Sequence, residues 1–298
     1  GFASRLDVPP TIVKSITRNK ADCFDRKYAH KLDSWLCSID GNDIDITNTG
    51  VPPSFLALGD SHMYSFLPAL QDFAENNGVT GAYTGFSGCP PLLAMHSLRK
   101  DQNEKNCNEL NKRVFQYVKA NNISDIVLVA RWTYYTNGNY FGGGVNFLGF
   151  EPSDTKSKEH SREVFVRSLH NTVGAYNNIG VKVHVILQVP MQKYEPLKAY
   201  QLAYRSGNYD SKLFKELSVS VTQHEQFNGF VNKAFYDLRS SFSNIYLYDP
   251  AVLLCDANIC PIGSAEVSYY FDDDHLSVDG SKILGSLLDI KLSAISNH

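Results

Sequence analysis

The sequence predicts an α/β protein, a three-layer α/β/α sandwich with a mainly parallel central sheet. Strand-like apolar runs alternate about five times with segments whose apolar residues recur at helical spacing. The 298 residues are 43% hydrophobic and 20% charged, which is the composition of a globular chain with a full core. Because strands that alternate with helices build a parallel sheet covered on both faces, the alternation predicts the sandwich.

The first half of the chain begins irregularly and then becomes regular. Residues 1–51 carry two cysteines and a polar stretch without periodicity, so we expect an extension or linker there and the regular domain at 52–298. Short apolar runs predict strands at 55–58, 79–83 and 126–130, and helical spacing predicts helices at 63–76 and 104–119. In the second helix Leu110, Val114 and Val118 lie one turn apart on the same face.

The second half continues the alternation. Apolar spacing predicts helices at 162–176, 223–239 and 278–296, and apolar runs predict strands at 181–189 and 245–248. Phe165, Leu169 and Val173 share one face of the first of these helices, and Ser277 is a suitable N-cap for the last. Residues 192–208 are polar and rich in tyrosine and have no clear period, so no element is expected there.

Charge and hydropathy exclude two classes of protein. The chain has 28 Lys and Arg against 31 Asp and Glu, a net charge of −3, and no basic block of the kind that binds nucleic acid. No apolar run approaches the roughly 18 to 20 residues that span a bilayer, so we expect the chain as given to be soluble. It begins at Gly1 without Met or an apolar signal segment, which favours an excised fragment or a mature form.

The six cysteines form three local pairs, and none lies in a C-x-x-C motif, so zinc ribbons and thioredoxin-type redox sites are not indicated. The spacing favours the disulfides Cys23–Cys37, Cys89–Cys107 and Cys255–Cys260. Disulfides track oxidising compartments. The alternative is six buried free thiols in a cytosolic protein, and a thiol titration under denaturing, non-reducing conditions distinguishes the two.

A candidate nucleophile follows the first predicted strand. In a parallel α/β sheet, ligands bind outside the carboxyl ends of the strands, where side chains and free helix N–H groups meet. Residues 55–62 are an apolar strand followed by a Gly-Asp-Ser turn, which places Ser61 at the start of a helix. A serine in that position has its own backbone N–H free to face a developing oxyanion.

A second reactive segment, Asp272-Asp273-Asp274-His275, precedes the last predicted helix. Asp272 lies three residues before His275, and in one compact turn this spacing brings a carboxylate to one imidazole nitrogen while the other nitrogen faces a hydroxyl. Activation of a serine needs such a base and such a carboxylate. On the sequence alone, Asp273 and Asp274 compete with Asp272 for the role of the carboxylate.

Each motif also has an ordinary structural interpretation. Gly-Asp-Ser can be a turn that caps a helix, and an acidic cluster beside a histidine can be a solvated loop or a cation site with oxygen ligands. Both motifs fall at strand-to-helix junctions at opposite ends of the regular domain, which favours the catalytic interpretation. The histidines elsewhere are scattered singly without metal-ligand spacing, so no metal site is expected.

Four motifs in this order resemble a known family. They are Leu58-Gly59-Asp60-Ser61-His62, Ser87-Gly88-Cys89-Pro90-Pro91-Leu92, Val129-Ala130-Arg131-Trp132 and Asp272-Asp273-Asp274-His275-Leu276-Ser277. The first and last are similar to the first and last blocks of the SGNH (GDSL-type) hydrolase superfamily. All four together resemble the periplasmic SGNH domain of acyltransferase-3/SGNH fusion proteins, over residues 52–298.

The resemblance implies a fold, an activity and a setting. The fold is the SGNH-hydrolase-like sandwich, and the activity is O-acetylation of bacterial surface glycans, notably the O-antigen of lipopolysaccharide. The implied partners are a glycan acceptor and an N-terminal membrane acyltransferase-3 domain of the same polypeptide, which this chain does not include. That domain would supply the acetyl group from acetyl-CoA, with no cofactor bound here, and the SGNH domain would lie in the periplasm, tethered to the inner membrane.

Carried over position by position, the resemblance makes Ser61 the nucleophile, His275 the base and Asp272 its orienting partner. Gly88 matches the glycine of the second block, whose N–H joins that of Ser61 in the oxyanion hole.

The third block departs from the superfamily pattern. Hydrolases of the superfamily present an Asn side chain there as a further donor, whereas this chain has Arg131-Trp132. An arginine can donate N–H groups or hold a carboxylate, so both residues are candidate oxyanion or substrate contacts, and efficient hydrolysis by water is not expected. The ordinary alternative is a structural salt bridge for Arg131 and core packing for Trp132.

Two further predictions concern the surroundings of the site. His62 is expected to point away from the site because of its helical backbone. The tyrosines between Tyr134 and Tyr140, with Gly142–Gly144, form a loop that either lines a sugar site, since aromatic faces stack on pyranose rings, or merely covers the surface.

Three functions are compatible with this interpretation of the motifs. The first is an O-acyltransferase that works through an acyl-Ser61 intermediate. The second is a carbohydrate O-acetyl esterase that uses the same site with water, and it is favoured if the domain turns over p-nitrophenyl acetate in a reaction that Ser61→Ala abolishes. The third is a non-catalytic glycan-binding module, which is excluded if Ser61→Ala or His275→Ala eliminates acetylation in the full-length protein.

Overall fold

The computed structural model of the chain, which describes residues 8–18, 24–26, 29–40, 46, 50–99, 106–206 and 215–288, contains the predicted sandwich. Its described residues form a central sheet in the order β1-β3-β2-β5-β7-β9. The strands are β1 (Cys37–Ser38), β2 (Phe55–Gly59), β3 (Gly81–Gly85), β5 (Asp125–Val129), β7 (Lys182–Ile186) and β9 (Ile245–Tyr248). Only the β1–β3 pair among these neighbours is antiparallel, so the predicted fold class is confirmed.

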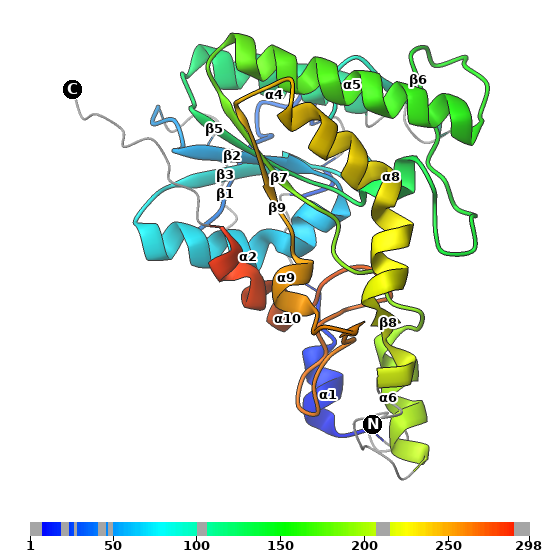
Figure 1. Ribbon diagram of the computed structural model, residues 1–298. Coiled ribbons are helices and arrows are strands. Elements are labelled where there is room, and N and C mark those ends of the chain that lie inside the picture. Colours follow the sequence, from blue (N-terminus) through cyan, green and yellow to red (C-terminus); the bar gives the residue numbers. More distant parts are fainter. Residues whose placement is uncertain are drawn as a thin grey trace.

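Helices cover both faces of this sheet (Figure 1). One layer consists of α4 (Cys107–Ala120), α5 (Lys158–Asn178) and α8 (Val221–Arg239). The other consists of α2 (Ser61–Asn77) and α10 (Val278–Ile283), which pack against each other and are followed by a 3-10 turn over Leu284–Leu287. These helices agree with the predicted ones to within a few residues at their starts.

Alternate residues of the strands divide the core into two clusters. Leu56 and Leu58 of β2 face the cluster that includes Val114 of α4 and Phe165 of α5. Ala57, between them, faces the cluster on the α2 side. Successive side chains of a strand point to opposite faces, so a strand that is apolar throughout requires a helical layer on each side.

Several short elements were not predicted from the sequence. They are α1 (Pro10–Ser15), α6 (Pro196–Arg205), α9 (Ala251–Leu254), and the antiparallel pairs β4 (His96–Ser97) with β6 (Leu148–Gly149) and β8 (Val219–Ser220) with β10 (Ile259–Cys260). Strands of two residues are too short to show a period, and α6 lies in the segment 192–208 for which no element was expected. Its buried Ala199, Tyr200 and Ala203 do have helical spacing.

The described part of the extension packs into the domain. Cys37 and Ser38 of β1 pair with Tyr83 and Ala82 of β3, so residues before the predicted boundary at 51/52 form the edge of the same sheet. Phe24 stacks on Tyr64 of α2 at a centroid distance of 4.6 Å.

The last predicted helix, over 278–296, is wrong in its described part. The α-helix ends at Ile283 and tightens into the 3-10 turn, and residues 289–298 lie outside the described ranges. Gly285 in that turn lies so close to α2 that a Cβ added to it would be 3.2 Å from Cβ of Asp72. Among the helices that the structure describes, none is both long enough and apolar enough to cross a membrane.

Candidate active site

The candidate nucleophile lies where β2 passes into α2. Asp60 is the N-cap of α2, since its carboxylate accepts a hydrogen bond from the backbone N–H of His62 at 2.8 Å, and Ser61 is the first residue of the helix. Gly59 is required at the end of β2, because a Cβ there would lie 1.8 Å from the carbonyl oxygen of Val129 on β5. This close approach places the turn at the carboxyl edge of the sheet, as the sequence predicts for Ser61.

Asp60 connects three elements beneath the serine. Its buried carboxylate also accepts hydrogen bonds from the hydroxyl of Tyr135 at 2.6 Å and from the backbone N–H of Arg131 at 3.0 Å. Burial, followed by the neighbouring carboxylate, raises the pKa of Tyr135, so its hydroxyl remains a donor. The hydrogen bonds of Asp60 to Tyr135 and Arg131 were not predicted from the sequence. An acidic residue just before a helix indicates an N-cap, but no local pattern identifies its distant partners.

The structure brings His275 and Asp272 to Ser61. Nε2 of His275 lies 2.7 Å from Oγ of Ser61, and Nδ1 of His275 lies 2.8 Å from Oδ2 of Asp272. Asp272 also accepts hydrogen bonds from the backbone N–H groups of His275 at 2.7 Å and Asp274 at 3.1 Å, which closes the loop into a tight turn. The geometry is that of a serine, a base and a carboxylate that orients the base.

A second carboxylate contacts the same imidazole nitrogen. Oδ1 of Asp274 lies 2.8 Å from Nδ1 of His275, and Asp274 is only 2% exposed. Its other oxygen forms an ion pair with Nη1 of Arg131. Asp273 makes no described contact with His275 and instead borders a neighbouring hollow. Of the three aspartates that compete on sequence grounds, two therefore reach the histidine.

His62 also belongs to this cluster, so the prediction that it points away is wrong. Its ring centroid lies 4.6 Å from that of His275, and its Nε2 lies 3.7 Å from Oδ1 of Asp274. The loop that carries His275 folds over the first turn of α2, and a side chain at the second helical position then lies under the loop. His62 is 4% exposed, and its Nε2 has no hydrogen-bond partner among the described residues.

The charges of this cluster favour a protonated imidazole. Burial lowers the pKa of His275, but the hydrogen bonds to Asp272 and Asp274 and their charges outweigh it and raise the pKa to about 10. Burial works against the Asp274 carboxylate, yet its contacts with His275, His62 and Arg131 hold its pKa well below the usual range. Burial and the two neighbouring carboxylates raise the pKa of Asp273. The site is therefore arranged to stabilise the imidazolium that forms when a histidine accepts a serine proton.

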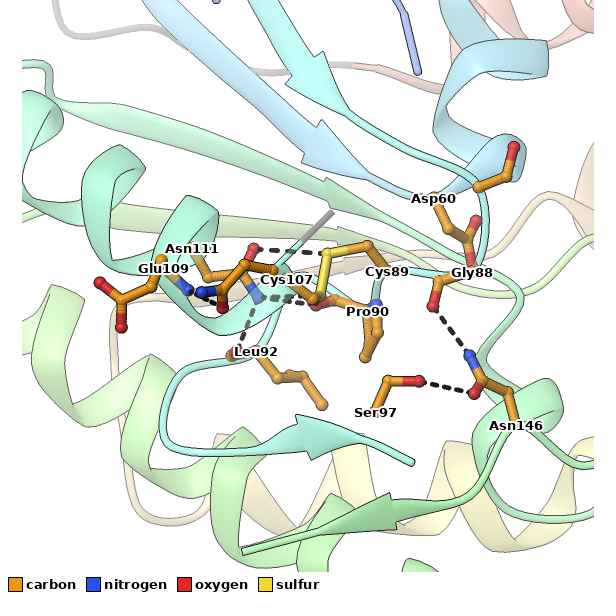
Figure 2. Close-up of a disulfide and its surroundings, with 12 residues drawn as sticks. Asp60, Gly88, Cys89, Pro90, Leu92, Ser97, Cys107, Glu109, Asn111 and Asn146 are labelled. Carbon is orange, nitrogen blue, oxygen red and sulfur yellow. Dashed lines mark hydrogen bonds between the residues drawn. A yellow bond between two sulfur atoms is a disulfide. The ribbon is translucent and has the colours of Figure 1, made fainter. Parts of the chain in front are cut away.

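Gly88 lies in the turn that follows β3, near Asp60 (Figure 2). The carboxyl ends of β2 and β3 lie in close contact, since a Cβ added to Gly85 would lie 2.0 Å from the carbonyl oxygen of Gly59. Gly88 has a φ of +76°, a conformation that favours glycine. Among the hydrogen bonds of the described residues none uses the N–H of Ser61 or of Gly88, so neither group is engaged by an acceptor within the described part of the chain.

Arg131 and Trp132 have separate roles. Arg131 holds the carboxylate of Asp274, and its guanidinium lies 5.1 Å from the ring centroid of Tyr134. Trp132 is fully buried, donates its indole N–H to the carbonyl of Ile186 at 2.8 Å and packs against core aromatic rings. The prediction that Trp132 contacts an oxyanion or a substrate is therefore wrong, because an indole with no exposed surface cannot reach a substrate. Trp132 is a core residue.

Two of the three predicted disulfides lie entirely within the described residues. They are Cys89–Cys107 and Cys255–Cys260. Cys37 is also disulfide-bonded, and its predicted partner, Cys23, lies outside the described residues. The Cys89–Cys107 bridge follows Gly88 directly and ties its turn to the start of α4 (Figure 2).

The acidic loop has side chains of metal-ligand type. Within the described ranges, His62, Asp274 and His275 form one such group, and Asp272, Asp273 and Asp274 form another. The guanidinium of Arg131 already neutralises Asp274, which both groups share, so a second cation there would meet an adjacent positive charge.

A hollow with a volume of about 460 Å³ opens beside the acidic loop. Its lining includes Asn139, Tyr140, Phe141, Tyr194, Gln223 and Asp273. Phe141 is 94% exposed, whereas the ring of Tyr140 packs on Phe227 at a centroid distance of 4.3 Å and its hydroxyl donates to the carbonyl of Met191 at 2.8 Å. In the predicted aromatic loop, residues 140–141 thus line a cavity. Tyr134 instead contacts the guanidinium of Arg131, and Tyr135 donates a hydrogen bond to Asp60.

The fold and this constellation define an SGNH-hydrolase-like domain. The chain belongs to the family described as the SGNH domain fused to AT3 domains, whose model matches residues 22–289. A search of curated proteins finds no match to the chain.

Several solved structures are similar to this chain. The periplasmic domain of a lipopolysaccharide acetyltransferase from Salmonella ser. Paratyphi A matches with a TM-score of 0.58 and 15% identity, over 79% of this chain and 82% of that chain. A GDSL-like lipase from Bacteroides thetaiotaomicron VPI-5482 matches with a TM-score of 0.42 and 10% identity, over 78% and 84%. An acetylxylan esterase from Geobacillus stearothermophilus, solved as a catalytic mutant, matches with a TM-score of 0.40 and 12% identity, over 80% and 93%.

Proposed function

We propose that this domain is a serine-dependent O-acetyltransferase that passes an acetyl group through acyl-Ser61 to a hydroxyl of a cell-surface glycan of the O-antigen type. The observation that carries the proposal is the 2.7 Å contact between Ser61 and His275, with Asp272 on the other imidazole nitrogen. Membership of a family fused to AT3 domains and the fold shared with a lipopolysaccharide acetyltransferase domain support transfer as the activity.

The proposal includes a setting. The acetyl group comes from acetyl-CoA by way of an N-terminal membrane acyltransferase-3 domain of the same polypeptide. The SGNH domain works in the periplasm, tethered to the inner membrane, where disulfides such as Cys89–Cys107 persist.

In the first half-reaction Oγ of Ser61 attacks the carbonyl carbon of the acetyl donor. The hydroxyl proton passes to Nε2 of His275, and the N–H groups of Ser61 and Gly88 stabilise the tetrahedral oxyanion. His275 then gives the proton to the leaving group of the donor as the bond to the acyl carbon breaks. The products are acetyl-Ser61, the protonated leaving group and a neutral His275.

In the second half-reaction a sugar hydroxyl takes the place of the leaving group. His275 accepts its proton while the sugar oxygen attacks the acyl carbon of acetyl-Ser61. The same two N–H groups stabilise the second oxyanion, and collapse returns the proton to Oγ of Ser61. If water enters instead of the sugar, the same steps make the domain an esterase.

The hollow beside Asp273 supports a glycan as the acceptor. It combines the exposed ring of Phe141 with amide side chains of Asn139 and Gln223, so an apolar face lies among groups that donate and accept hydrogen bonds. A pyranose has both kinds of surface, and pockets that bind such ligands use a few polar groups to fix orientation.

The test is intact-mass spectrometry of the domain after incubation with p-nitrophenyl acetate, comparing the wild type with Ser61→Ala and His275→Ala. We expect one acetyl group on the wild type only, which persists in water and is discharged when an O-antigen glycan is added. Rapid ester turnover without an accumulated adduct indicates the esterase. Neither adduct nor turnover, with unchanged acetylation by full-length protein carrying Ser61→Ala, refutes the proposal.

A further inference from the structure

One buried amide holds the turn that carries Gly88. Nδ2 of Asn146 donates a hydrogen bond to the carbonyl oxygen of Gly88 at 2.8 Å, and Asn146 is only 2% exposed (Figure 2). The two residues are 58 positions apart. Asn146 lies just before β6, and its own backbone N–H donates to the carbonyl of Tyr134 at 2.8 Å, so its position is tied to the segment that follows β5.

Ser97 sets the orientation of this amide. Its hydroxyl donates to Oδ1 of Asn146 at 2.7 Å, so Nδ2 is the end that faces Gly88. An asparagine side chain can rotate to exchange its donor and acceptor ends, and the exchanged form would set Oδ1 against the carbonyl oxygen of Gly88. The hydroxyl of Ser97 therefore donates to Asn146, and the amide of Asn146 donates to Gly88.

The preceding residue is held from the other side. The carboxylate of Asp25 accepts hydrogen bonds from both the backbone N–H and the hydroxyl of Ser87, each at 2.8 Å. The backbone N–H of Cys89 donates to the carbonyl of Phe86 at 3.0 Å, which closes the turn. Gly88 therefore lies between two fixed neighbours, with its own carbonyl fixed by Asn146.

We propose that Asn146, oriented by Ser97, is a positioning residue that keeps the N–H of Gly88 directed at the oxyanion. The inference rests on the proposed function, since it assumes that Ser61 forms a tetrahedral intermediate. Glycine reaches many backbone conformations at similar cost, so a donor carried by Gly88 requires an external restraint. A donor that is fixed before the reaction needs no reorganisation when the negative charge develops, which is the origin of the rate gain.

Asn146 lies outside the third block, where hydrolases of the superfamily have an asparagine. At that block this chain has Arg131, whose guanidinium is engaged with Asp274. The buried amide of this site thus comes from a different part of the chain and acts on the carbonyl of the oxyanion residue.

The test compares three alanine variants by their rate of labelling. Asn146→Ala removes the restraint, Ser97→Ala removes only its orientation, and Asn111→Ala is the matched control. Asn111 is an equally buried amide that holds the same turn two and four residues past Gly88, at the carbonyls of Pro90 (2.8 Å) and Leu92 (2.7 Å). The readout is the second-order rate constant for modification of Ser61 by a fluorophosphonate, measured by intact mass, because the phosphoryl oxygen gains negative charge in the oxyanion hole while Ser61 attacks and fluoride leaves.

We expect Asn146→Ala to slow labelling by about 30-fold and Ser97→Ala by about 5-fold, below the loss of 10² to 10³ for deletion of a whole oxyanion donor. The double variant should be no slower than Asn146→Ala, since Ser97 acts only through Asn146. Asn111→Ala should label within about 3-fold of the wild type although its thermal stability falls, because it loses two buried hydrogen bonds.

Labelling of Asn146→Ala and Ser97→Ala at the wild-type rate overturns the inference. Equal slowing by Asn111→Ala also overturns it, since the effect would then be general loosening of the turn. If Asn146→Ala does not fold, the inference depends on Ser97→Ala and the control. A wild-type protein that is not labelled at Ser61 refutes the proposed function itself, which distinguishes the two failures.

Discussion

The second carboxylate on His275 leads to a prediction about pH. Burial lowers the pKa of His275, but the hydrogen bonds and charges of Asp272 and Asp274 outweigh it and raise the pKa from 6.5 to about 10. An opposite charge in direct contact accounts for roughly 1 to 3 units of such a shift. Asp274→Asn should therefore lower the pKa of His275 by roughly 2 units, and the guanidinium of Arg131, no longer neutralised, acts in the same direction.

The rate should follow the neutral imidazole. With a pKa of about 10, only about one molecule in a thousand has neutral His275 at pH 7. Asp274→Asn should raise this fraction about 100-fold, while the weaker base costs about 10-fold, so labelling of Ser61 by a fluorophosphonate at pH 7 should become about 10-fold faster. Above pH 10 the variant should be slower than the wild type.

The assay is an NMR titration of the His275 ring between pH 6 and 11, together with labelling rates over the same range. The matched control is Asp273→Asn, which removes a carboxylate of the same loop that has no described contact with the ring. The reasoning is refuted if the midpoint for His275 is the same in the wild type and Asp274→Asn, or if Asp273→Asn shifts it equally.

The raised pKa of His275 also makes the stability of the fold depend on pH. The protonated imidazole contributes its full free energy of stabilisation below pH 6.5, and this contribution is lost as the pH rises through about 10. The melting temperature should therefore fall over that range, and it should fall less in Asp274→Asn.

Further expected outcomes concern the supports of the site and the acceptor. Tyr135→Phe should lower the free energy of unfolding by about 1.5 to 3 kcal/mol in urea denaturation, because the buried Asp60 carboxylate loses a donor; an unchanged midpoint would show that Asp60 does not depend on it. Serine replacement of both cysteines in the Cys89–Cys107 bridge, 18 residues apart, should cost about 3 kcal/mol in the same assay, and a loss below 1 would contradict the entropic argument. Phe141→Ala should slow discharge of acetyl-Ser61 to a glycan by about 10-fold while acylation by p-nitrophenyl acetate stays unchanged; equal slowing of both would place Phe141 in the chemistry rather than at the acceptor.

The layers of the sandwich could be predicted because their signals are local. An apolar run such as 126–130 can be a strand only if both of its faces are covered, and the helical spacing of Phe165, Leu169 and Val173 marks a helix that covers one of them. Short elements such as β4 and β6 were missed because two residues carry no period. The last helix was predicted too long because apolar spacing alone does not distinguish the α-helix that ends at Ile283 from the 3-10 turn that follows it.

The sequence by itself determined which residue types stand at the strand-to-helix junctions. It therefore indicated Ser61 and His275 and left three adjacent aspartates as candidates for the carboxylate, because a turn at the carboxyl end of a strand faces the same edge of the sheet wherever it occurs in the chain. Only the tertiary structure decided what surrounds them. Asp274 reaches His275 because the acidic loop folds into a tight turn, and Asn146 reaches Gly88 across 58 residues. Such contacts depend on how loops close over the sheet, and a hydrogen bond between distant residues leaves no period in the sequence.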